Sequence, residues 1–273
     1  MKKTLILFLL LPIYLLGNFS ALNNGARSLG MGNTFVALSD DASAVFYNPA
    51  GLGRVEKLSS IVSYQNMYGI KGLHNSMLSV ALPTPIVRMG LSFQNLSLDN
   101  LYDESIYYLS VASIIRPNNV PIRFGASVKI ESVSVNYLSN TQNPSNIDLD
   151  FGALIDLNKF TYLGYSLKNL LEPVFKFQSH SGQIKRRHVL GICHRWRESV
   201  NFLADFNVSS EGTYWNFGSE IWFHNVFASR IGVMDQKLTI GFGLKSDLWR
   251  LDTAVLSHEE LGSTYRFSFG LNI

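Results

Sequence analysis

The sequence has few charged residues and only one cysteine. Asp, Glu, Lys and Arg make up 16% of the 273 residues, whereas soluble domains usually carry about 25%. The lone Cys193 excludes an intramolecular disulfide framework and argues against a cysteine-based metal cage. The formal net charge of +3 is too small to indicate a nucleic-acid partner. The chain therefore lacks the side chains that usually cover a water-facing surface.

Long apolar runs are also missing after the N-terminus. No later segment offers the ~18 consecutive apolar residues of a membrane-spanning helix, so a helical membrane protein is excluded. The N-terminus itself is typical of an export signal, with Lys2 and Lys3 before an apolar run from Leu5 to Leu16 and small residues after it. We expect residues 1–21 to be a signal peptide that is removed on export.

Motifs for catalysis, cofactors and metals are absent or incomplete. Neither Gly-x-Ser-x-Gly nor His-Glu-x-x-His occurs, so we expect no enzymatic activity. The stretch from Gly30 to Phe35 begins like a dinucleotide-binding loop, but Phe35 stands at the third glycine position and no strand precedes it. In an alternating strand, Cys193 points away from His188 and His194, which argues against a metal site there. We expect no cofactor and no bound metal.

The sequence does contain apolar and polar residues that alternate with a period of two. In residues 237–245, Leu238, Ile240, Phe242 and Leu244 alternate with lysine, threonine and glycine, which predicts a strand with one apolar face. The alternation recurs in 87–95, 122–131, 147–157 and 200–208. Its phase shifts at Ser132 and Val133, which predicts a β-bulge.

Fourteen such segments are predicted to be strands. With its connection each takes about 15 residues, and a membrane strand needs ~9–11, so the connections must be short. The predicted strands are 59–65, 74–82, 86–95, 105–115, 121–138, 147–157, 160–170, 187–196, 199–208, 213–223, 225–234, 236–245, 247–257 and 263–273.

Alternation alone does not say which face points inward, because a soluble barrel or sandwich hides its apolar face and a membrane barrel displays it. The low charge, the export signal and the aromatic residues at predicted strand ends favour a membrane barrel. So do the connections, which are short at 83–85, 158–159, 197–198 and 224 and longer at 65–73, 96–104, 139–146 and 171–186. We predict that residues 59–273 form an all-β, antiparallel up-and-down transmembrane β-barrel in a bacterial outer membrane, surrounded by lipid.

Residues 22–58 do not follow the strand pattern. They are rich in glycine, Ser39-Asp40-Asp41 can cap a short helical turn, and Asn48 can cap a second turn that starts at Pro49. A barrel of fourteen strands encloses a lumen too wide for wall side chains alone to fill. We therefore predict an N-terminal hatch of short helical turns inside the lumen.

The stretch from Gly25 to Leu52 resembles the N-terminal block of the PorV/PorQ family, which belongs with the FadL-type fatty-acid transporters. Its letters are GARSLGMGNTFVALSDDASAVFYNPAGL. The resemblance implies a fourteen-stranded outer-membrane barrel with an N-terminal hatch, and the family's Asn-Pro-Ala hatch motif maps to Asn48, Pro49 and Ala50. The hatch residues expected in this stretch are Gly30, Gly32, Asp40, Asp41, Asn48, Pro49, Ala50 and Gly51.

Three functions follow as expectations. The resemblance favours transport or protein secretion across the outer membrane, with a secretion-system protein as partner. The alternative is FadL-type passive uptake of small hydrophobic molecules such as long-chain fatty acids, and a third is a structural barrel with a permanently closed hatch. An apolar path to a gap between strands would favour uptake, whereas a polar, blocked lumen with an apolar extracellular patch would favour a protein partner.

Charged residues at inward positions of the alternation are expected to line the lumen. Unpaired charges of both signs in a confined space are costly, so we predict that they pair with each other or with the hatch, through Arg27 or through Asp40 and Asp41. We also expect Thr239 to face this lumen and to meet water there. The expected lumen charges are Arg123, Lys129, Asp148, Asp150, Asp156, Arg187, Arg195 and Asp205.

Overall fold

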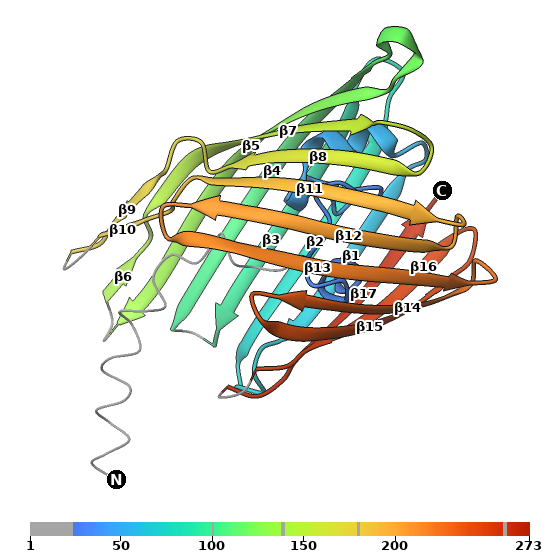
Figure 1. Cartoon of the computed structure of the whole chain (residues 1–273). Helices are drawn as coiled ribbons and strands as arrows, with labels where there is room; N and C mark the ends of the chain where they lie inside the picture. The colour runs from blue at the N-terminus through green and yellow to red at the C-terminus, as the bar shows by residue number, and fades with distance from the viewer. Residues whose placement is uncertain (1–23, 100, 138–139, 179–180, 259–260) are drawn as a thin grey trace.

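The computed structural model describes residues 24–99, 101–137, 140–178, 181–258 and 261–273, and antiparallel strands form most of it (Figure 1). The predicted signal peptide, residues 1–21, lies outside the described residues. Fourteen of the described strands form one closed wall. In chain order they are β1 (Ser59–Asn66), β2 (Leu73–Pro83), β3 (Arg88–Leu98), β4 (Tyr102–Ile115), β5 (Ile122–Tyr137), β7 (Ser145–Asp156), β8 (Thr161–Lys168), β11 (Arg187–Trp196), β12 (Val200–Ser209), β13 (Gly212–Phe223), β14 (Phe227–Met234), β15 (Lys237–Lys245), β16 (Trp249–Leu256) and β17 (Thr264–Asn272).

The wall closes because its first strand pairs with its last. Each of these strands pairs antiparallel with its neighbours in chain order, and β1 also pairs with β17 from Ser59–Asn272 to Asn66–Tyr265. The predicted fourteen-stranded up-and-down barrel is thus confirmed. Since all neighbouring strands are hydrogen-bonded, the described part of the wall contains no gap between strands.

The two faces of the wall are inverted relative to a soluble protein. Phe242 and Leu244 on β15 are 47% and 45% exposed on the outside of the barrel. Thr239 on the same strand points inward and is fully buried. The outward face is almost entirely apolar along the other strands as well, and the inward face is largely polar. This arrangement suits a surface that contacts hydrocarbon, and it excludes the soluble sandwich with an apolar core.

The predicted bulge in β5 is wrong. The pairing of β5 with β4 runs without interruption from Ile122–Ile115 to Val135–Tyr102. Val133 points inward like Glu131, and it is buried among apolar side chains. The phase shift in the sequence therefore marks a change of the inward face from polar to apolar along one regular strand.

Residues 24–58 lie inside the ring of strands, where Figure 1 shows them in blue. They contain α2 (Ala26–Gly30), α3 (Ala44–Tyr47) and the 3₁₀ helix η2 (Pro49–Arg54). None of the described helices is long and apolar enough to cross a bilayer. Asn48 caps η2 as predicted, because its side chain accepts a hydrogen bond from the Ala50 N–H. Helix α2 was not predicted.

The predicted cap of the other turn is only partly present. Helix α3 begins after Ser43, whose side chain makes no cap bond. Asp41 instead accepts hydrogen bonds from the Ser43 N–H and hydroxyl, whereas Asp40 faces Arg27.

The connections differ in length at the two ends of the barrel only in part as predicted. The connections 67–72 and 169–186 are long, but the one predicted at 96–104 is only 99–101, and 210–211 and 235–236 at the same end are short as well. We call the end with the turns at 84–87, 157–160, 197–199 and 224–226 the short-turn end, and the opposite end the long-loop end. The C-terminus lies at the short-turn end (Figure 1). The connection between β8 and β11 at the long-loop end holds an unpredicted hairpin of β9 (Val174–Lys176) and β10 (Ser181–Gln183), and β6 (Asn140–Gln142) pairs with β5. At the short-turn end, η3 (Pro117–Asn119) joins β4 to β5.

Candidate functional site

Glycines on eight strands bring the inner wall against residues 24–58. At each of them an added Cβ would come within 3.0 Å of an atom of this N-terminal segment. Two facing walls that touch in this way leave no room for a methyl group. We call these residues the glycine belt: Gly90, Gly125, Gly152, Gly164, Gly191, Gly218, Gly232 and Gly241.

The closest contacts of the glycine belt involve the expected hatch residues. A Cβ on Gly125 would meet the backbone of Pro49 and Ala50, and a Cβ on Gly232 would meet the backbone of Gly32. Gly32 also has a positive φ of 65°, a conformation that side chains rarely adopt. Both sides of this contact therefore require glycine.

Asn48 joins three parts of the lumen through one side chain. Its Nδ2 donates to the carbonyl oxygen of Val36 at 2.9 Å and to that of Ala153 on β7 at 3.1 Å, while its Oδ1 caps η2. The side chain is fully buried. Asn48 thus fixes η2 both to the preceding loop and to the wall.

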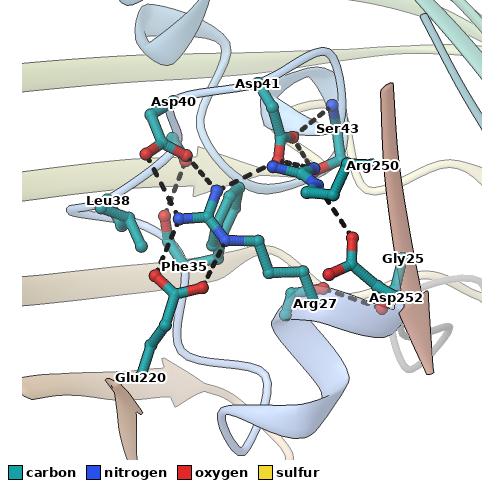
Figure 2. A network of polar contacts seen from close by, with 12 residues as sticks. Gly25, Arg27, Phe35, Leu38, Asp40, Asp41, Ser43, Glu220, Arg250 and Asp252 are labelled. Carbon is teal, nitrogen blue, oxygen red and sulfur yellow. Dashed lines mark hydrogen bonds and ion pairs between the residues drawn. The ribbon is translucent and has the colours of Figure 1, made fainter. Parts of the chain in front are cut away.

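Arg27 is the centre of a buried ionic network (Figure 2). Its guanidinium donates to both carboxylate oxygens of Glu220 on β13 at 2.8 and 2.9 Å, and to Asp40 and Asp41 of its own segment. Glu220 is fully buried and also accepts hydrogen bonds from Arg230 on β14 and from Asn201 on β12. The network therefore ties α2 to three neighbouring strands.

Arg250 on β16 extends the network to the other side of the segment. It donates to Asp41 at 2.5 Å and lies 2.8 Å from Asp252, which in turn lies 2.9 Å from Arg230. Burial alone would raise the pKa of Asp41, but Arg250 and Arg27 outweigh it and lower this pKa to about 2. Asp41 is therefore ionised at neutral pH.

Two cavities at the short-turn end adjoin the network. A polar cavity of about 220 Å³ is lined by Arg27, Asp40, Asp41, Arg250 and Lys245, among others. A larger cavity of about 850 Å³ shares Asp40 and Lys245 with it and contains residues of the turns at 224–226 and 246–247. The ionic network is thus the floor of an opening at this end of the barrel.

Two of the predicted lumen charges contact the N-terminal segment. Asp156 on β7 pairs with Arg54 of η2 at 2.5 Å and with Arg123 of β5 at 2.7 Å. Asp205 on β12 accepts hydrogen bonds from the backbone N–H groups of Phe35 and Val36.

The structure also brings Lys129, Asp148 and Asp150 together. The Lys129 ammonium lies 3.1 to 3.2 Å from Glu131, Asp148 and Asp150, and all four side chains are buried. No group of three or more His, Cys, Asp or Glu in the described residues is arranged to hold a metal ion. This cluster is therefore an ionic contact of the wall itself.

Arg187 and Arg195, the remaining predicted lumen charges, lie beside aromatic rings and are half-buried. Arg187 lies 5.9 Å from the ring centre of Tyr214, and Arg195 lies 5.5 Å from that of Tyr162 and donates to Asn201. The sequence analysis missed Glu220, Arg230, Arg250 and Asp252. The alternation contained the signal, because Glu220 and Arg230 each lie two residues from an inward glycine, Gly218 and Gly232.

Thr239 does not face open water, contrary to our expectation. It is fully buried, accepts a hydrogen bond from the Gly32 N–H at 2.9 Å and donates one to the Gly30 carbonyl oxygen. The N-terminal segment occupies the space that the sequence analysis assigned to water.

The inward face changes character toward the long-loop end. There the wall and the loop that carries β9 contribute buried apolar side chains, which pack into one cluster with apolar side chains of the N-terminal segment. We call this group the apolar lumen cluster: Leu73, Met77, Leu96, Tyr102, Ile106, Val133, Phe175 and Ile184.

The fold is similar to that of two toluene transporters and of a FadL homologue. The chain is similar to the toluene transporter TodX of P. putida (TM-score 0.62, 11% identity, 92% of this chain and 99% of that one). It is also similar to the toluene transporter TbuX of Ralstonia pickettii (0.60, 10%, 91% and 97%) and to a FadL homologue of Pseudomonas aeruginosa (0.55, 12%, 92% and 98%). No family model and no curated protein matches the sequence.

Proposed function

We propose that the protein is a non-enzymatic outer-membrane barrel that takes up small hydrophobic molecules, with residues 22–58 as its hatch. The observation that carries this proposal is the apolar lumen cluster, because it gives a barrel with a largely polar inner wall an apolar lining at the long-loop end. The similarity to toluene transporters and a FadL homologue supports the same class of cargo. In this orientation the long-loop end is extracellular and the short-turn end periplasmic.

Uptake of labelled toluene by cells that lack their own hydrocarbon channel tests the proposal. We expect expression of the protein to raise the rate of toluene uptake. The substitution Ile106→Asn should lower this rate, because it places a buried amide in the apolar lumen cluster, where it disfavours an apolar solute. Arg116→Asn, at an exposed position between β4 and η3 at the short-turn end, is the control. Uptake no faster than in cells without the protein would refute the proposal.

The hatch has its own test, the conductance of a variant without residues 24–58 in planar bilayers. We expect this deletion to open an ion-conducting pore, since the glycine belt leaves the wall without side chains where the segment lay. Conductance equal to that of the intact protein would show that the segment does not close the lumen.

A secretion role of the PorV/PorQ type is a second candidate, and two observations favour it. The lumen on the short-turn side of the apolar lumen cluster is filled by a tightly fitted segment, and the described wall has no lateral gap. At the long-loop end, Ile70, Leu101, Leu171 and Leu261 expose 43 to 53% of their surface, which suits a protein partner. Loss of protein secretion in a deletion strain, with unchanged toluene uptake, would favour this candidate.

A further inference from the structure

Arg266 is a buried charge that forms no ion pair with any described residue. This β17 residue is 1% exposed, and none of its three guanidinium nitrogens has a hydrogen-bond partner within the part of the chain that the structure describes. Arg27, Arg230 and Arg250 are also buried, but each of them contacts carboxylates. Arg266 is therefore the exception among these lumen arginines, and a buried unpaired charge is costly to any fold.

Further unpartnered polar groups adjoin Arg266 along the wall. Gln65 on β1 is its register partner, Asn75 on β2 is the partner of Gln65, and Gln94 on β3 lies diagonally beyond Asn75. All three amides are at least 98% buried. Among the described residues, Gln65 Oε1 and both amide atoms of Asn75 and of Gln94 lack hydrogen-bond partners. We call Arg266, Gln65, Asn75 and Gln94 the Arg266 cluster.

The Arg266 cluster lies where the polar and apolar parts of the lumen meet. Two residues beyond Arg266, the Ser268 hydroxyl accepts a hydrogen bond from the Ala26 N–H, which places Arg266 on the long-loop side of α2. Leu73 and Met77 flank Asn75 on the inward face of β2, and both belong to the apolar lumen cluster. A solute that contacts the Arg266 cluster therefore has apolar side chains beside it.

We propose that the Arg266 cluster binds the head group of an amphipathic solute that carries an acidic group and a hydroxyl or N–H donor. This inference rests on the proposed uptake function and narrows its substrate class. A pure hydrocarbon would leave every group of the cluster unpaired. A simple carboxylate or phosphate accepts hydrogen bonds from Arg266 but offers no donor to the amide oxygens of Gln65 and Asn75. A head group with an acid and a donor satisfies both, and the alkyl part of the solute contacts Leu73 and Met77.

The test compares ligands of one chain length on the full-length mature protein in lipid nanodiscs. Equilibrium dialysis measures the binding of decanol, decanoate, decyl phosphate and β-hydroxydecanoate. We expect the acids to bind about tenfold or more tightly than decanol, because a hydrogen bond to a charged group is worth at least this factor. The hydroxyl should add a further gain of about threefold. The ratio between decanoate and decyl phosphate shows which acid the site prefers.

Two variants assign the preference to Arg266. Arg266→Gln should reduce the affinity for decanoate and β-hydroxydecanoate to that for decanol and leave decanol unchanged. Arg197→Gln, in an exposed turn at the short-turn end, is the control and should keep the preference. If Arg266→Gln does not fold, the ratio of the affinities for the acids and for decanol in the unmodified protein still tests whether the lumen prefers an acidic head group.

The outcomes separate this inference from the proposed function. Equal binding of decanol and the acids, or a preference that survives in Arg266→Gln, overturns the head-group inference and leaves hydrophobic uptake standing. Decanoate bound as tightly as β-hydroxydecanoate overturns the donor requirement. Failure of all four compounds to bind overturns this inference, and the toluene uptake assay then decides separately whether the proposed function stands.

Discussion

Neutralising Glu220 should release the N-terminal segment from the wall. Glu220 accepts two hydrogen bonds from Arg27, one from Arg230 and one from Asn201, and its side chain is fully buried. In Glu220→Gln the two guanidinium groups lose their shared counter-charge, and the new amide N–H₂ faces donors. Removing one partner of a buried ion pair costs about 3–5 kcal/mol, so we expect the free energy of unfolding to fall by this amount.

The measurement is urea unfolding of the protein in lipid vesicles, followed by tryptophan fluorescence. Glu172→Gln is the matched control, because Glu172 pairs with Arg186 at 3.7 Å on the surface and both side chains are at least 34% exposed. Such a surface pair contributes about 0–1 kcal/mol. If the two variants lose the same free energy, the Arg27 network does not hold the segment as we argue.

Three further predictions concern the outer face, the acid response and the η2 cap. Phe242→Arg puts a charge on the lipid-facing side of β15 and should cost about 2–4 kcal/mol in vesicles, whereas Ser246→Arg in an exposed turn should cost little; equal losses would contradict the membrane orientation. Because the pKa of Asp41 is lowered from 3.8 to about 2, its stabilisation is present above pH 3.8 and is lost as the pH falls toward 2; Asp41→Asn should flatten this part of a stability profile, and an unchanged profile would speak against the pairing. Asn48→Ala should lower the free energy of unfolding by about 1 kcal/mol or more through loss of the cap, measured by the same urea titration, with no change if the cap is dispensable.

The strands were predictable because their period is directly visible in the sequence. Residues 237–245 alternate strictly, and the structure exposes Phe242 and buries Thr239 accordingly. Val133 breaks the alternation of polar inward residues, and in the sequence an inward apolar residue looks the same as a shift of phase. The period of two therefore predicts the strands of the wall, but only where each face of a strand keeps the same polarity along its whole length.

The contacts inside the lumen were less predictable. The pairing of Arg27 with wall carboxylates could be anticipated from charge alone. Its partner Glu220 could not, because nine wall strands lie between them in the chain and the choice depends on how the segment lies in the lumen. The alternation of β17 places Arg266 on the inward face, between the outward Tyr265 and Phe267. Nothing in the sequence indicates that Arg266 has no hydrogen-bond partner among the described residues.

The glycine belt also constrains the order of events when the chain assembles. The segment directly precedes β1, and β1 pairs with β17 at the seam that joins the two ends of the barrel. The glycine belt contacts the segment so closely that not even a methyl group would fit between them. A folded segment could therefore not enter the barrel after β1 and β17 have paired. We therefore expect the segment to be in place while the seam is open, so that it acts as a template around which the last strand docks. Bulky residues in the belt would then slow seam formation before they affect the finished barrel.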